Sequence, residues 1–76
     1  MNKQRRDRID TLKESLAGLK SELETIQEEE QEAYDAMPEG LQSSERGEKA
    51  QAAADALSEA VSQLDGAIEQ LEEAVE

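Results

Sequence analysis

The chain has 76 residues, and its 20 acidic and 8 basic side chains give it a net charge of −12. It contains no cysteine and no histidine, which excludes disulfides, thiolate metal sites and the commonest general base in proteins. The strong negative charge disfavours direct binding to nucleic acids and anionic membranes. A chain of this size buries little apolar surface alone, so we expect it to need a partner.

The N-terminal residues are charged and do not lead into an apolar stretch. Lys3, Arg5, Arg6 and Arg8 make this the basic end of an otherwise acidic chain. No apolar run approaches the roughly 20 residues of a transmembrane helix. We therefore expect neither a signal peptide nor a membrane span, and a protein that works in the cytoplasm.

Apolar residues in the first half recur at alternating spacings of three and four. This heptad pattern predicts an amphipathic helix over about residues 3–36 that packs on other helices. Glu30 occupies the next position of the pattern, and we expect it to reach solvent or a base such as Arg46, because a buried unpaired carboxylate is costly. A functional role for Glu30 is the alternative. The predicted core residues of this helix are Ile9, Leu12, Leu16, Leu19, Leu23 and Ile26.

A turn is predicted at the middle of the chain by the sequence Pro38-Glu39-Gly40. We place this tip at about residues 37–43 and a second helix at about residues 44–75, with Ser43 or Ser44 as its N-cap. Three rows of apolar residues recur every seven positions in this helix, and so wide a stripe indicates contact with more than one helix. The rows are Leu57, Leu64 and Leu71; Ala54, Val61, Ile68 and Val75; and Ala53, Ala60, Ala67 and Ala74.

Two helices of similar length with a short connection predict an all-α fold. We expect residues 1–76 to form a single antiparallel two-helix hairpin, resembling a coiled coil. The hairpin leaves much of its apolar surface exposed to solvent, so we expect it to associate with itself. A twofold dimer that forms a four-helix bundle is favoured, with a higher oligomer or a different partner protein as the alternatives.

The sequence carries no motif for catalysis or for a cofactor. No nucleophile paired with a base and no Gly-rich phosphate loop is present. The acidic run Glu28-Glu29-Glu30 is typical of a solvated helix face, and metal sites in helical bundles use histidines that this chain lacks. We predict a protein that is not an enzyme and that needs no metal or cofactor.

The tip is the part of the chain that departs most from the heptad pattern. It contains Tyr34, the only aromatic residue, and the isolated Arg46. The simplest interpretation is structural: Tyr34, Met37 and Leu41 close the end of the hairpin, and Arg46 neutralises Asp35 or Glu30. The functional alternative is a binding patch, with Tyr34 stacking on a ligand and Arg46 holding an anion.

The basic N-terminus has a similar choice of interpretations. Arg5, Arg6 and Arg8 can pair with the acidic C-terminus of their own hairpin. If two hairpins associate antiparallel, these arginines instead approach Tyr34 and Arg46 of the other chain. Two symmetric pockets for an anionic ligand would result.

The tip resembles a group of small acidic proteins encoded by tailed phages and prophages. The similarity covers about 20 residues, and position 36 is Ala where the group more often has Asn. The resemblance implies a phage origin, a location in the bacterial host cell and an accessory or counter-defence role. The matching residues are Glu29, Glu30, Gln31, Glu32, Ala33, Tyr34, Asp35, Met37, Pro38, Glu39, Leu41, Gln42, Ser44, Arg46, Gly47 and Glu48.

Three functions follow in order of preference. The first is a binding protein that sequesters a host nucleotide immune signal in pockets between subunits, built from Tyr34, Arg46, Arg5, Arg6 and Arg8. The second is an acidic inhibitor that imitates nucleic acid and occupies the basic groove of a host defence protein. The third is a structural module that only oligomerises.

Overall fold

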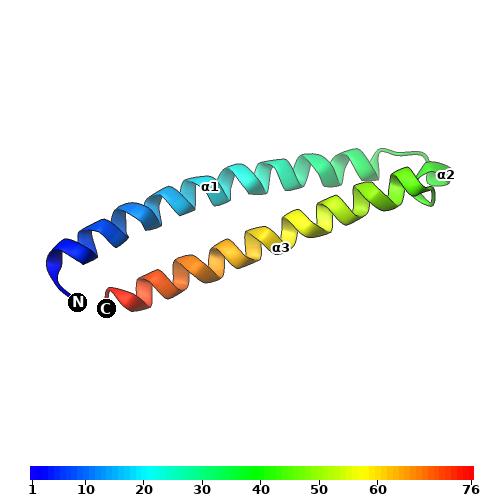
Figure 1. Cartoon of the computed structure of the whole chain (residues 1–76). Helices are drawn as coiled ribbons and strands as arrows, with labels where there is room; N and C mark the ends of the chain where they lie inside the picture. The colour runs from blue at the N-terminus through cyan, green and yellow to red at the C-terminus, as the bar shows by residue number, and fades with distance from the viewer.

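The computed structural model describes residues 1–76 and is built from helices alone (Figure 1). Helix α1 spans Lys3–Asp35, the short α2 spans Glu39–Gln42 and α3 spans Glu45–Ala74. The two long helices lie side by side and run in opposite directions, so both termini lie at one end and α2 at the other (Figure 1). The molecule is a rod of 58 × 15 × 13 Å. The prediction of an all-α chain is confirmed.

The ends of α1 follow from local backbone chemistry. Asn2 caps its first turn, because the side-chain Oδ1 accepts a hydrogen bond from the Arg5 backbone N–H at 2.9 Å. At the other end Pro38 disfavours helical geometry in the residue before it. The helix therefore stops at Asp35, where the N–H of Ala36 donates to the Glu32 carbonyl at 2.9 Å and the N–H of Met37 to the Tyr34 carbonyl at 3.1 Å.

Helix α2 lies inside the tip predicted at about residues 37–43. The Pro38 carbonyl accepts hydrogen bonds from the backbone N–H groups of Leu41 and Gln42, at 2.8 and 3.1 Å. The Gln42 side chain then donates to the Tyr34 carbonyl at 3.1 Å and ties α2 to the end of α1. Hydrogen bonds therefore order the connection between the two long helices.

Ser44 caps α3 and connects it to α2. Its hydroxyl accepts a hydrogen bond from the Gly47 backbone N–H at 3.4 Å and donates one to the Leu41 carbonyl. Gly47 is one of only two buried residues. A Cβ atom at this position would lie 2.5 Å from the carbonyl carbon of Gln42 and would collide with the carbonyl oxygens of Leu41 and Gln42. The close packing of α2 on α3 therefore requires glycine at position 47.

The predicted core of α1 is divided between two environments. Ile9, Leu16 and Leu23 are half-buried on the side that contacts α3. Leu12, Leu19 and Ile26 remain 59, 55 and 51 % exposed, because one neighbouring helix covers only one side of so wide a stripe. The predicted core residues of the second long helix are all half-buried: Leu57, Val61, Leu64, Ile68 and Leu71 of α3 and Val75, its C-cap.

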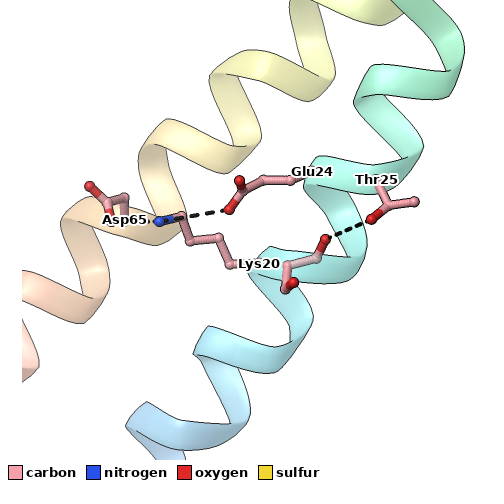
Figure 2. Close-up of polar contacts among 5 residues, drawn as sticks. Lys20, Glu24, Thr25 and Asp65 are labelled. Atoms are coloured by element: carbon pink, nitrogen blue, oxygen red, sulfur yellow. Dashed lines mark hydrogen bonds and ion pairs between the residues drawn. The ribbon is translucent and has the colours of Figure 1, made fainter.

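One ion pair joins the two long helices. Nζ of Lys20 in α1 lies 2.8 Å from Oδ1 of Asp65 in α3 and 3.8 Å from Oε1 of Glu24 in its own helix. Figure 2 shows the ammonium group reaching across from α1 to the α3 carboxylate. This contact marks the register of the two helices: residues that follow Lys20 lie opposite residues that precede Asp65 by a similar number of positions.

Candidate functional site

The candidate ligand-binding residues fall into two clusters at opposite ends of the rod. Tyr34 and Arg46 lie at the tip, near the end of α1 and the start of α3. Arg5, Arg6 and Arg8 lie in the first turns of α1. From Arg8 to Tyr34 the helix rises about 40 Å, so one chain does not bring the two clusters together.

At the tip, the two candidate residues differ in exposure. Tyr34 is half-buried and Arg46 is exposed. The guanidinium of Arg46 makes no hydrogen bond or ion pair within the chain, since the three ion pairs all belong to Lys20 or Lys49. The expected neutralisation of Asp35 or Glu30 by Arg46 is therefore absent from the structure.

The apolar side chains that were expected to close the tip, Tyr34, Met37 and Leu41, are covered to different extents. Met37, like Tyr34, is half-buried. Leu41 remains 45 % exposed, so it is only partly covered. Backbone hydrogen bonds and the polar contacts of Gln42 and Ser44 also hold the tip together.

At the other end, Arg5, Arg6 and Arg8 are exposed. None of them has a carboxylate within 4.0 Å, although the acidic end of α3 lies beside the start of α1 (Figure 1). Pairing of these arginines with the C-terminus of their own chain is not observed.

Glu30 lies on the side of α1 that contacts α3 and is half-buried. Its carboxylate has no hydrogen-bond or ion-pair partner in the chain. It keeps contact with water, because no buried side-chain oxygen or nitrogen is left without a partner. Of the two expected environments, contact with solvent is therefore present, and pairing with a base such as Arg46 is not.

The single chain offers few places for a small ligand. It encloses no pocket, and no three acidic residues converge as the ligands of a metal ion would. None of the helices carries an apolar stretch of the length and composition needed to cross a bilayer.

Two features of this surface were not predicted from the sequence. The first is the Lys20–Asp65 ion pair, whose only signal was a lysine next to the apolar seam. The second is the separation of Leu12, Leu19 and Ile26 from the residues that contact α3. The heptad pattern predicts both apolar rows of α1, but it does not predict which row the neighbouring helix covers.

No protein-family model, curated protein or solved structure matches this chain.

Proposed function

We propose that this chain is a binding protein without enzymatic activity that works as a dimer of helix pairs, arranged as a four-helix bundle. The support is its exposed surface. The chain exposes 5604 Å², whereas a monomeric protein of its mass typically exposes about 4,600 Å². The excess, about 1,000 Å², is close to the roughly 800 Å² that each partner buries in a standard protein interface.

The ligand that we propose is an anionic nucleotide, held in two pockets between subunits. The observation that carries this proposal is that none of the four arginines concerned has a carboxylate partner in the chain. Arginine is well suited to bind phosphate through paired N–H donors. In an antiparallel dimer, Arg5, Arg6 and Arg8 of one chain approach Tyr34 and Arg46 of the other, and Tyr34 supplies a surface on which a base can stack.

The biological role that we propose is counter-defence by a phage or prophage. The resemblance of the tip to small acidic phage proteins supports it, and sequestration needs only stoichiometric binding. Such a protein would lower the free concentration of a nucleotide immune signal in the host cytoplasm and thereby prevent activation of its effector.

A second candidate is an acidic inhibitor that occupies the nucleic-acid groove of a host defence protein. The observation that favours it is the net charge of −12, with most carboxylates free of any ion pair. Such binding would weaken steeply with added salt and would not respond to nucleotides. A third possibility, a module that only oligomerises, predicts neither effect.

Thermal denaturation with a panel of cyclic dinucleotides, cyclic trinucleotides and ADP-ribose tests the proposal. We expect at least one compound to raise the Tm of the wild-type protein, and we expect Tyr34→Ala and Arg46→Ala to lose that shift. Lys49→Ala is the matched control, because Lys49 is an exposed base near Arg46 whose ion pair with Glu45 lies within α3. The sequestration proposal fails if no nucleotide shifts the Tm, or if Lys49→Ala and Arg46→Ala have the same effect.

A further inference from the structure

We propose that the helix pair docks on a second copy of itself through one side, with α1 antiparallel to α1 of the partner subunit. We call this side the lateral face; it rests on the self-association proposed above and adds the surface, the direction and the register. Its residues are Leu12, Leu19 and Ile26 of α1 and Ala60, Ala67 and Ala74 of α3.

The two rows of the lateral face lie on the same side of the rod. In α1 the row through Leu19 lies about a quarter turn from the line that contacts α3. In α3 the row through Ala67 lies a similar angle from the line that contacts α1. Because both helices are right-handed and run in opposite directions, the two rotations carry the rows to the same side. The exposure agrees: the α1 row is more than half exposed, and Ala67 and Ala74 are exposed as well.

The quarter-turn offset determines the shape of the assembly. If α1 of each chain contacts the other α1 on the lateral face, each α3 lies at a right angle to that contact. The four helices then occupy the corners of a square, as in a four-helix bundle. The two α3 helices meet through their alanine rows, and the small side chains allow their backbones to approach closely. A single docking operation therefore covers both exposed rows.

A second copy is the occupant because this face is complementary to itself in charge. With Leu19 on the twofold axis, Leu12 lies opposite Ile26 of the partner subunit. On the row next to the leucines, Arg8 then lies opposite Glu29 of the partner subunit. Neither side chain has an ion-pair partner within its own chain, and the symmetry makes this pair twice. A parallel arrangement would instead place the basic starts of both α1 helices together.

The same register places the arginine clusters near one another. Arg46 belongs to the same seven-residue row as the alanines, at the tip end of the lateral face. Arg5 belongs to the leucine row, at the opposite end of the rod. Antiparallel docking brings Arg5 of one chain close to the tip of the other. At each end of the lateral face Arg5 of one chain and Arg46 of the other therefore come near one another, as the proposed nucleotide pocket requires.

Disulfide trapping tests the face without destabilising the fold. The chain has no cysteine of its own, so one substitution gives one thiol. We expect Leu19→Cys to form a covalent dimer under mild oxidation, because residues on the twofold axis lie within the 7 Å that a disulfide can bridge. The matched control is Ser21→Cys, which is exposed on the opposite side of α1 and should stay monomeric on a non-reducing gel. Failure of Leu19→Cys to cross-link, or cross-linking of Ser21→Cys to the same extent, overturns the proposed face.

Charge reversal tests the direction and the register. We expect Glu29→Arg to weaken dimerisation about tenfold at low salt, since it replaces two attractive pairs by two repulsive ones. Addition of Arg8→Glu should restore the dimer, and Glu28→Arg, the same change on the opposite side of α1, should have little effect. Equal weakening by both single reversals, or no rescue by the double variant, overturns the register.

These experiments separate the interface from the ligand. If Leu19→Cys cross-links and no nucleotide raises the Tm, the lateral face stands and the nucleotide proposal fails. If a nucleotide binds but Leu19→Cys does not cross-link, the interface lies on another face and the proposal made here is overturned. A pure protein that stays monomeric and binds a different protein through this face also overturns it.

Discussion

Lys20 of α1 donates a hydrogen bond from Nζ to Oδ1 of Asp65 in α3 at 2.8 Å, and this is the one ion pair that joins the long helices. The two residues are separated by 45 positions in the chain. Apolar contacts between the helices are spread along similar seven-residue rows, which tolerate a shift by one heptad. A single polar contact is lost when one helix shifts by a heptad along the other. We therefore infer that the Lys20–Asp65 pair selects the register.

Removal of this pair should lower stability and loosen the register. We expect Lys20→Met to reduce the Tm of the protein, because the aliphatic part of the side chain remains while the contact with Asp65 is lost. Lys49→Met is the control, since the ion pair of Lys49 with Glu45 lies within one helix and does not connect α1 to α3. Thermal melting followed by circular dichroism distinguishes the two, and an equal loss in both variants would argue against a register role.

The same pair predicts a dependence on alkaline pH. The hydrogen bond to Asp65 raises the pKa of the Lys20 ammonium above its ordinary value, which is about 10.4. A base whose pKa is higher in the folded state stabilises the fold fully below the unfolded pKa and loses this effect as the pH rises through the folded pKa. We therefore expect the Tm difference between wild type and Lys20→Met to be constant from pH 7 to about pH 9 and to shrink above pH 10. A difference that persists unchanged at pH 11 is inconsistent with this cause.

Two glycines in the helices should respond to alanine with opposite signs. Gly18 has no atom near the position of an added Cβ, so Gly18→Ala should stabilise the protein by about 0.5–1 kcal/mol. Gly47→Ala should destabilise it by about 1–3 kcal/mol, because the new methyl group collides with the backbone of α2. Chemical denaturation of the two variants measures both effects, and stabilisation by Gly47→Ala would show that α2 does not pack on α3 as described.

The Ser44 hydroxyl is expected to matter for two helices at once. It caps the start of α3 and donates to the Leu41 carbonyl at the end of α2. We expect Ser44→Ala to cost about 1 kcal/mol, the usual value for an N-cap. Ser43→Ala is the matched control, because the Ser43 hydroxyl bonds only to the carbonyl of Glu39 in its own turn. Similar losses in the two variants would count against a special role of Ser44.

The sequence predicted the helical class of the chain because the apolar spacing of three and four is specific to helices. Pro38 and Ser44 likewise indicated where the first long helix ends and the second begins. Helix α2 was not predicted, because four residues carry no periodicity. It is held by hydrogen bonds such as that from the Gln42 side chain to the Tyr34 carbonyl, which local sequence patterns do not predict.

The candidate site was less predictable than the fold. Tyr34 and Arg46 could be selected because they interrupt a regular pattern, but their contacts could not be derived. The ion pairs expected of Arg46 and of the N-terminal arginines are absent, since exposed pairs gain little free energy and are not imposed by proximity. Which of the two leucine rows of α1 meets α3 also depends on the rotation of the helix about its axis, and the heptad leaves this rotation open.

Sedimentation equilibrium of the pure protein is the most direct test of the central claim, that this helix pair associates with itself. The chain has a mass of 8.4 kDa. We predict a particle of twice that mass at micromolar concentration, with full helicity by circular dichroism in the same sample. A helical, cooperatively melting protein that sediments at 8.4 kDa over the whole concentration range would contradict the account.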